Sequence, residues 1–234
     1  MNEIEWFKFE NKDRDFPFYK HNPRISKKGW FILWISVFLA VIAYALVGEV
    51  CPEIIASIIF ALILVIPVLY FCNWDLSLLF QKPKLKEIAL AIGLFAGYII
   101  YAMVMGEVLS FLGFLSDESM VNISIDALFI ISLFFSLMAE ELIKFIPFMF
   151  FMRLFYKYSN NRKLAIIVSM LLVMVGFALM HFTGFQFLVS VLVIQGFGSI
   201  FEFYGYIKTK NLLISYITHL TTDVFLFMAI LLGV

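Results

Sequence analysis

Long apolar stretches separated by short polar connections dominate the chain. Each stretch is close to the 20 residues that a helix needs to cross about 30 Å of hydrocarbon, and the backbone groups of a lipid-embedded segment are satisfied within a helix. The pattern predicts an all-α protein, a polytopic transmembrane helix bundle of about seven spans. The expected spans lie near residues 30–48, 54–72, 87–113, 127–152, 164–182, 187–206 and 211–233.

The charges of the connections predict an orientation. Basic residues gather in the N-terminal region and in three connections that would lie on its side of the membrane, near residues 82–86, 153–163 and 208–210. The opposite side carries acidic residues at 49 and 53 and the pair Asp117 and Glu118. Because cytoplasmic loops are rich in lysine and arginine, we expect a cytoplasmic N-terminus, with residues 1–29 as a cytoplasmic segment and 30–234 as an integral membrane domain.

Composition agrees with a multi-pass protein of the cell membrane. Hydrophobic residues make up 63% of the chain and charged residues 15%, well below the roughly 25% typical of soluble domains. The net charge of zero gives no indication of a nucleic-acid partner, so membrane lipid is the expected environment. No apolar region precedes Trp30 that could serve as a cleavable signal. The compact size, without organelle signals, favours a bacterial plasma membrane.

The two cysteines give no information about the redox compartment. Cys51 and Cys72 flank the second apolar stretch. A helix of about 20 residues holds its ends roughly 30 Å apart, which is far beyond the reach of a disulfide.

Three charged residues interrupt the fourth apolar stretch. Glu140, Glu141 and Lys144 lie within five residues, between phenylalanines on both sides. A charged side chain at bilayer depth costs at least about 2.5 kcal/mol, so such a group indicates a functional or a pairing role. Helical spacing puts Lys144 one turn from both glutamates, so it can neutralise one and leave the other available. An ion pair that only joins helices is the alternative.

Further polar residues lie in the later stretches. His181 ends the fifth, and His219 and Asp223 lie one helical turn apart on the seventh, so that one face carries both. A lone histidine such as His181 is more often an interhelical hydrogen-bonding group, and a carboxylate beside a histidine can serve either a working or a static site. Glu202 lies about 9 Å along its helix from Lys208, which places it close enough to the inner membrane interface to be simply solvated.

The four strongest candidates form one chemical set. Glu140, His181, His219 and Asp223 supply a carboxylate base, two imidazoles and a second carboxyl group, which suit the activation of water and the stabilisation of a tetrahedral oxyanion. Glu107 lies near an expected aqueous edge and is assigned no function. We therefore expect the three helices that carry the set to converge.

These residues resemble three motifs of the CPBP family, the type II CAAX endopeptidase and bacteriocin-processing intramembrane proteases. The family patterns are EExxxR, FxxxH and HxxxN or HxxxD, on successive late helices, and the resemblance covers about 127–225. One position departs, because Phe145 replaces the arginine and Lys144 is the nearest cation. EExxK with HxxxD is similar to the related PrsW proteases. The matching residues are Glu140, Glu141, Phe177, His181, His219 and Asp223.

The resemblance implies an intramembrane endopeptidase that hydrolyses a peptide bond of a membrane-associated or lipidated protein or peptide. It implies that Glu140 is the general base and that His181 helps to hold the water. His219 would donate to the oxyanion, and Asp223 would either donate when protonated or orient His219. Lys144 would pair with Glu141, and Phe177 belongs to the supporting residues.

A metal site is the alternative to a glutamate-activated water. Glu140, His181 and His219 could supply three ligands to zinc and leave one position open. No HExxH pair exists, however, and Glu140 cannot easily serve as both ligand and base. We therefore favour a site without a metal cofactor.

Two other classes of protein compete with the protease. A non-catalytic scaffold or sensor-kinase modulator would keep the fold, and Phe145 favours it. A proton-coupled transporter would use carboxylates and histidines as relays, but transporters usually show paired repeats, and none is evident here. Helix geometry also places His181 near the outer end of its span and Glu140 near the middle of the membrane, so convergence requires tilt or a shifted fifth helix.

Overall fold

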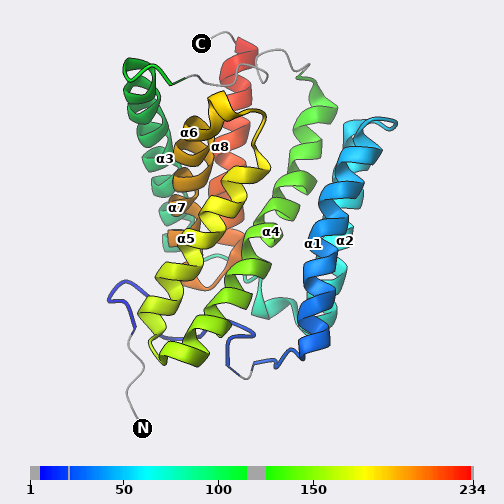
Figure 1. Cartoon of the computed structure of the whole chain (residues 1–234), viewed down its shortest axis with the longest axis vertical. Coiled ribbons are helices and arrows are strands. Elements are labelled where there is room, and N and C mark those ends of the chain that lie inside the picture. The colour runs from blue at the N-terminus through cyan, green and yellow to red at the C-terminus, as the bar shows by residue number, and fades with distance from the viewer. Residues whose placement is uncertain (1–5, 21, 115–124, 233–234) are drawn as a thin grey trace.

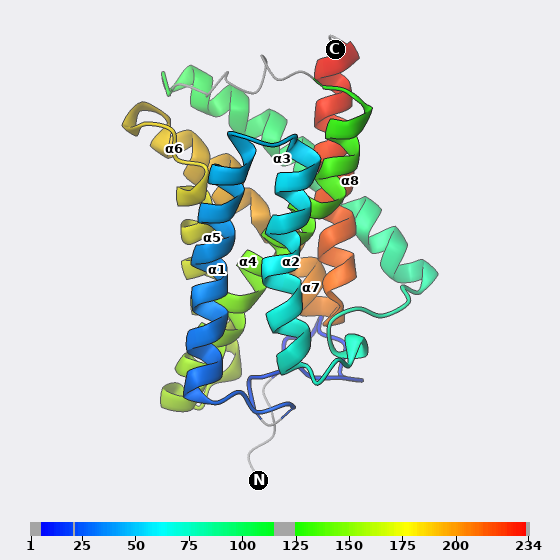
Figure 2. The ribbon, with the colours of Figure 1, turned by 90° about the vertical axis from the view of Figure 1, so that its right-hand side faces the viewer.

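Helices form every regular element in the part of the chain that the structure describes. The structure is a computed structural model that describes residues 6–20, 22–114 and 125–232. Most long helices run along the longest axis of the molecule (Figure 1), whereas α3 crosses the others obliquely (Figure 2). The long helices are α1 (Lys27–Gly48), α2 (Glu53–Phe71), α3 (Leu85–Phe111), α4 (Ala127–Ser159), α5 (Arg162–Met180) and α8 (Leu212–Leu232).

Within the described residues, six helical segments are long and apolar enough to cross a membrane, so the predicted all-α polytopic bundle is confirmed. These segments are α1, α2, α3, α5, the interrupted segment Phe185–Thr209 and α8. The fourth predicted span, 127–152, belongs to α4 and is not among these six segments. That helix has 33 residues, which is ample length, but its charged cluster interrupts its apolar sequence. The cytoplasmic position of the N-terminus stays a prediction, and Asp117 and Glu118 lie outside the described residues.

Two tight turns place the later helices side by side. Asn160 ends α4 in the left-handed conformation at φ 51°, and the side chain of Asn161 then accepts the N–H of Leu164 to begin α5. Lys210, at φ 52°, closes α7 (Ile200–Thr209) in the same way before α8 begins. Asparagine tolerates this conformation and caps helix N-termini well. The turns make α4 and α5, and α7 and α8, neighbours.

The sixth predicted span is not one regular helix. It comprises η3 (Phe185–Phe187), α6 (Leu188–Val191), a π-helical turn η4 (Leu192–Gly196), η5 (Phe197–Ser199) and α7. A Cβ atom added to Gly196 would lie 2.8 Å from the Cβ of Ala178 on α5, and one on Gly198 would lie 2.7 Å from the ring of Tyr98 on α3. The missing side chains let this segment fit between α3 and α5, as small residues do at membrane helix interfaces.

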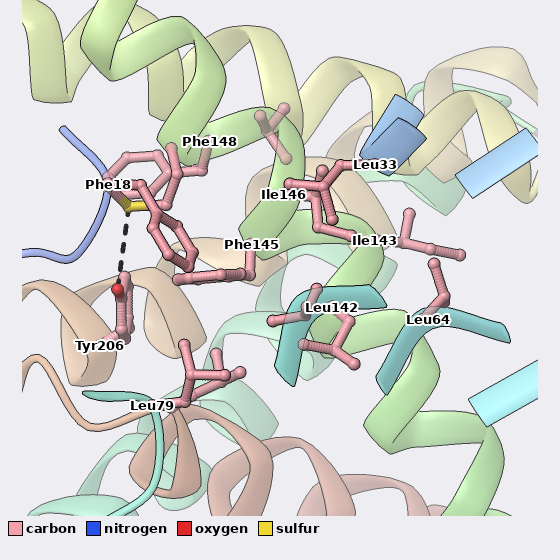
Figure 3. Close-up of a cluster of buried hydrophobic side chains, with 14 of the residues drawn as sticks. Phe18, Leu33, Leu64, Leu79, Leu142, Ile143, Phe145, Ile146, Phe148 and Tyr206 are labelled. Carbon is pink, nitrogen blue, oxygen red and sulfur yellow. Dashed lines mark hydrogen bonds between the residues drawn. The ribbon is translucent and has the colours of Figure 1, made fainter. Parts of the chain in front are cut away.

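The helix α4 lies at the centre of the bundle, in contact with α1, α2, α5 and α8. Its second half packs into an aromatic core that includes Phe145, Phe148 and Tyr206 (Figure 3). The ring centroids of Phe145 and Tyr206 are 5.7 Å apart and their planes meet edge to face, a preferred arrangement of aromatic pairs. This core fixes α4 against α7 directly beside the charged residues of α4.

The N-terminal segment, residues 6–26 apart from residue 21, folds under one end of the bundle. Its Phe16 and Phe18 are buried, and the ring of Phe18 lies 6.1 Å from that of Phe145. Its Glu10 forms buried ion pairs with Arg162 Nη2 at 2.7 Å and with Lys210 Nζ at 2.8 Å. The segment therefore joins both turns, α4–α5 and α7–α8, to the core.

Candidate functional site

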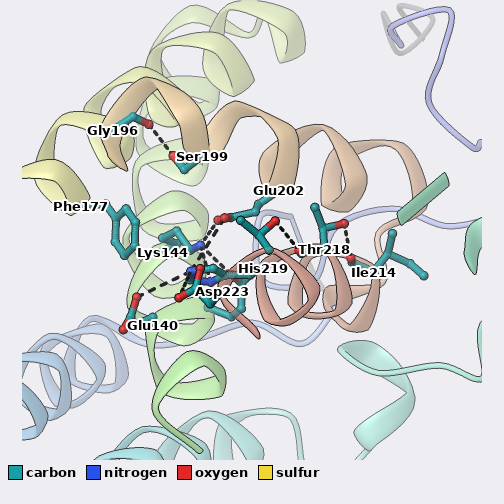
Figure 4. Close-up of polar contacts among 12 residues, drawn as sticks. Glu140, Lys144, Phe177, Gly196, Ser199, Glu202, Ile214, Thr218, His219 and Asp223 are labelled. Atoms are coloured by element: carbon teal, nitrogen blue, oxygen red, sulfur yellow. Dashed lines mark hydrogen bonds and ion pairs between the residues drawn. The ribbon is translucent and has the colours of Figure 1, made fainter. Parts of the chain in front are cut away.

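The imidazole of His219 lies at the centre of a charged cluster contributed by three helices. The cluster combines Glu140, Glu141 and Lys144 from α4, Glu202 from α7, and His219 and Asp223 from α8 (Figure 4). The helices α7 and α8 present their polar residues to α4 because the turn at Lys210 folds one helix back on the other. Residues separated by 78 positions in the chain thus come into direct contact.

The inner part of the cluster is closed to solvent. Lys144 Nζ lies 2.5 Å from Glu141 Oε1 and also forms an ion pair with Glu202 Oε2. The side chains of the three residues are at most 8% exposed. A buried charge without a partner is strongly destabilising, so each of these groups depends on the others. The predicted pairing of Lys144 with Glu141 is thus present.

The hydrogen bonds of His219 define its tautomer. Its Nδ1 lies 2.9 Å from Glu141 Oε1 and 3.4 Å from Lys144 Nζ. A carboxylate only accepts and an ammonium only donates, so the two contacts require opposite states of Nδ1. The contact with Glu141 is the shorter one, and it assigns a proton to Nδ1 that is donated to Glu141. The contact with Lys144 is then a close approach of two donors. The ring is fixed in orientation, and Nε2 faces the other carboxylates.

Three carboxylate oxygens surround Nε2 at longer distances. Glu140 Oε2 lies 3.9 Å, Asp223 Oδ2 3.8 Å and Glu202 Oε1 4.0 Å from His219 Nε2. These separations exceed a direct hydrogen bond and suit groups that share a water molecule. The side chains of Glu140 and Asp223 are 22% and 26% exposed, so this part of the cluster is open to entering molecules.

The aromatic ring of Phe177 covers the cluster from α5. Its centroid lies 4.6 Å from Lys144 Nζ and 6.3 Å from the centroid of the His219 ring. An ammonium over an aromatic face is favourable, especially away from water. Phe177 is 5% exposed and screens the buried ion pairs from one side. It supports the cluster, as the resemblance implies.

The structure does not bring His181 into direct contact with the other candidates. His181 caps the C-terminus of α5, and its Nδ1 lies 3.0 Å from the carbonyl oxygen of Phe177. Its ring packs on that of Phe177 at 4.8 Å. The contacts of the described residues therefore connect His181 with the cluster through Phe177, whereas carboxylate oxygens of Glu140 and Asp223 lie within 4 Å of His219 Nε2.

Phe145 points away from the charged cluster and into the aromatic core. It is 2% exposed and packs against Phe18 and Tyr206. An arginine at this position would place a cation among these rings. Lys144, one residue earlier, instead reaches Glu141 and Glu202. The departure from the family pattern is thus accompanied by a different cation on the cluster side of the helix.

A small cavity lies between the cluster and the aromatic core. It has about 10 Å³ of free volume and is lined by residues that include Glu141, Lys144, Glu202 and Ser215. This volume is close to the minimum that holds one water molecule, and the lining offers several polar partners. A single water there would be enclosed, behind the more exposed carboxylates of Glu140 and Asp223.

Glu202 is the member of the cluster that the sequence interpretation missed. We expected it to be solvated near Lys208, but it is 6% exposed and paired with Lys144. The error arose from measuring distance along the helix, whereas the N-terminal segment covers that end of the bundle. The signal was present in the sequence, because an ionisable residue within an apolar stretch marks a functional site by default.

The alternative zinc site is not assembled from the residues that we expected. Among the described residues, the group whose ligand atoms lie within 4.8 Å of one another comprises Glu141, Glu202 and His219, not Glu140, His181 and His219. Two carboxylates and an imidazole suit a divalent cation in their chemistry. The ammonium of Lys144, however, contacts all three residues. The set as folded therefore fits an internal lysine and not a metal ion.

The geometry of this cluster is the basis on which a function is assigned. It combines a closed part, in which Lys144 is paired with two carboxylates, with two partly exposed carboxylates that face one imidazole nitrogen. Comparison of the chain with models of protein families, with curated proteins and with solved structures finds no match.

Proposed function

We propose that the chain is an intramembrane endopeptidase that hydrolyses a peptide bond of a membrane-associated or lipidated protein or peptide. One observation carries the proposal: Glu140 Oε2 lies 3.9 Å from His219 Nε2 at a partly exposed edge, and the ring is held from behind by Glu141. A carboxylate and an oriented imidazole, separated by a distance that one bridging water molecule can span, are groups that peptide hydrolysis uses. The resemblance to CPBP proteases agrees with this reading.

The chemistry follows from the positions of the groups. Glu140 takes a proton from a water molecule beside His219, and the water oxygen attacks the carbonyl carbon of the substrate. The carbonyl oxygen becomes an oxyanion. When the C–N bond breaks, the protonated Glu140 returns the proton to the leaving amine, so the base is regenerated.

His219 stabilises the oxyanion in this proposal. Because its Nδ1 proton is committed to Glu141, Nε2 can donate only when the ring is an imidazolium. The carboxylates of Glu141, Glu202 and Asp223 lie within 4.0 Å of the ring nitrogens and favour that cation, whereas the single ammonium of Lys144, 3.4 Å from Nδ1, opposes it. Asp223 thus acts as a charge partner of His219, which is one of the two roles expected for it.

His181 has a lesser part than the resemblance implies. Its contacts are with Phe177, so it positions the ring that covers Lys144 and His219. We expect His181→Gln to retain more activity than His219→Gln. An equal loss of cleavage activity in both variants, measured by the same assay, would instead support the role in holding the water that the resemblance implies for His181.

The decisive experiment is cleavage by purified full-length protein in proteoliposomes. A library of fluorogenic single-span peptides, with and without a lipid anchor, serves as substrate. Glu140→Gln should abolish cleavage, with a loss of at least about 100-fold typical of a removed general base. Glu107→Gln is the matched control, because Glu107 is an exposed glutamate of α3. Cleavage that survives in Glu140→Gln would overturn the assignment.

A metal-independent reaction is part of the proposal. Cleavage should persist in the presence of a chelator, and purified protein should contain less than one zinc per chain. Zinc at full occupancy that is lost together with activity in Glu140→Gln would instead support the zinc alternative.

A non-catalytic scaffold is the second candidate. It is favoured by the burial of Phe145 in the aromatic core and by the buried ion pairs of Lys144 with Glu141 and Glu202. Ion pairs of this kind can join helices without taking part in a reaction. A scaffold would cleave no peptide of the library, and its binding to a partner protein would be unchanged by Glu140→Gln, His219→Gln or Asp223→Asn. We propose for either function a plasma membrane location with a cytoplasmic N-terminus, which fits the basic connections.

A further inference from the structure

A large basic cleft lies at the end of the bundle where α1 begins and α4 ends. It has a volume of about 750 Å³ and is formed by the N-terminal segment, the first turn of α1 and the last turns of α4. Five cationic side chains line it, and none of its lining residues is acidic. The cationic residues are Lys20, Arg24, Lys27, Arg153 and Lys157.

These cations have no carboxylate partner among the described residues. The ion pairs of this end of the bundle use Arg162 and Lys210 instead. Arg153 donates to the carbonyl oxygen of Phe18 at 3.3 Å, and Lys20 Nζ lies 5.1 Å from the centroid of the Tyr19 ring. Neither contact neutralises charge. A concentration of like charge around one cleft is unfavourable unless an anion enters it.

The cleft lies at the level where the apolar surface of the bundle begins. Phe31 and Phe38 of α1, 65% and 63% exposed, follow the cleft residue Trp30 along the helix. The start of α1 and the end of α4 lie at the same end of the molecule (Figure 1). Because tryptophan and basic residues concentrate at the headgroup level of membranes, the cleft faces the interface and not the hydrocarbon.

A hydrogen-bond donor in the lining also lacks an acceptor. The Nε1–H group of Trp30 is buried and has no hydrogen-bond partner among the described residues. Buried donors are nearly always satisfied, and this one belongs to a residue that lines the cleft, so a small movement of the lining would let it donate to a bound ligand. A phosphate offers both acceptor oxygens and the negative charge that the five cations require.

We propose that this cleft binds the phosphate headgroup of an anionic phospholipid. The acyl chains would lie along the exposed apolar surface of α1, and the headgroup would lie among the basic side chains. Arginine and lysine pockets beside membrane helices are suited to such headgroups. The inference is independent of the proposed peptidase, since no residue of the catalytic cluster lines the cleft.

The test uses full-length protein purified in a neutral detergent and titrated with mixed micelles of phosphatidylglycerol or phosphatidylcholine. Bound lipid is counted by native mass spectrometry, and thermal unfolding is followed in parallel. We expect phosphatidylglycerol to bind and to raise the unfolding midpoint, and phosphatidylcholine to do neither. Arg24→Gln with Arg153→Gln should weaken binding roughly 30-fold, since each basic residue near an anionic surface contributes about fivefold.

Matched variants separate a built site from general surface charge. Lys82→Gln with Lys86→Gln removes the same charge from exposed positions outside the cleft, and it should leave binding unchanged. Lys27→Gln with Lys157→Gln changes two exposed residues of the cleft, and it should also weaken binding of phosphatidylglycerol. This second variant replaces the arginine variant if the latter folds poorly. Equal weakening in the cleft and control variants would overturn the proposal, as would equal binding of both lipids. Stabilisation by inorganic phosphate alone, without lipid, would also overturn it.

Discussion

At the residue scale, two kinds of carboxylate surround His219. Glu141 and Glu202 are buried and bound to Lys144, whereas Glu140 and Asp223 are partly exposed and lie beyond direct hydrogen-bonding distance of the ring. The adjacent glutamates of α4 therefore face different surroundings, as the 100° between successive helical residues requires. The sequence predicted this division for Glu140 and Glu141.

The two adjacent glutamates should differ in their effect on stability. Glu141→Gln removes a buried partner of Lys144 and His219, so we expect a loss of about 3 kcal/mol in the free energy of unfolding. Glu140→Gln should change that free energy by less than about 1 kcal/mol, because its side chain is partly exposed. Denaturant unfolding in detergent measures both variants. Equal losses would mean that Glu140 is also structural.

Removal of the internal cation should create a metal site. Lys144→Ala leaves Glu141, Glu202 and His219 with ligand atoms within 4.8 Å of one another and no ammonium between them. We expect this variant to retain about one zinc ion per chain after dialysis, since three such ligands are sufficient for a zinc site. The native chain is the control. Zinc contents that do not differ would contradict a competition between Lys144 and a metal.

At the scale of the elements, the interrupted segment between α5 and α8 departs most from the sequence prediction. Apolar composition predicted a single helical span over 187–206. The segment is long and apolar enough to cross a membrane, but it is not one regular helix. A π-helical turn depends on packing against neighbouring helices, and π-helical turns are frequent near functional sites. Glu202 lies in the same segment, six residues after the π-helical turn ends at Gly196, so its position depends on a feature that hydropathy does not record.

The close contact at Gly196 should be sensitive to a single methyl group. In Gly196→Ala the added Cβ would lie 2.8 Å from Ala178 and 3.1 Å from the carbonyl oxygen of Met174, so α5 must shift. We expect a loss of about 1–3 kcal/mol in the free energy of unfolding and reduced cleavage, because α7 carries Glu202. Gly176→Ala is the control, since a Cβ there meets nothing within 4 Å. Similar stability of the two variants would contradict a tight interface at Gly196.

At the scale of the whole molecule, the all-α bundle of long apolar helices was the most predictable feature. Length and hydropathy of each segment depend on local sequence, and they predicted the helical bundle correctly. The convergence of α4 and α8 depends on packing between distant segments, so it could be expected only from the chemistry of the residues. The contribution of α7 to the cluster was not expected, because Glu202 was taken to be solvated. The docking of the N-terminal segment was not predicted, because its mixture of charges and aromatic residues has no helical or strand period.

Acid should weaken the attachment of the N-terminal segment. Burial alone would raise the pKa of Glu10, but hydrogen bonds from Arg162 and Lys210 outweigh it and hold the pKa below the ordinary 4.5. The contribution of Glu10 to stability is therefore complete above about pH 4.5 and is lost as the pH falls through the lowered value.

The difference in unfolding midpoint between the native chain and Glu10→Gln measures this contribution. We expect the difference to be constant from pH 7 to about 5 and to shrink below pH 4.5. Other carboxylates titrate in both proteins, so the difference isolates Glu10. A difference that persists unchanged at the lowest pH would show that the ion pairs of Glu10 do not hold the segment.

The contact between Asn11 and Lys210 constrains the order of biosynthesis. Lys210 Nζ donates to the carbonyl oxygen of Asn11 at 2.9 Å, across 199 residues of sequence. The N-terminal segment can thus form this contact only after Lys210, at the end of α7, has been synthesised. Until then the basic and aromatic residues of this segment remain available to chaperones and proteases, so their burial is a late step of folding.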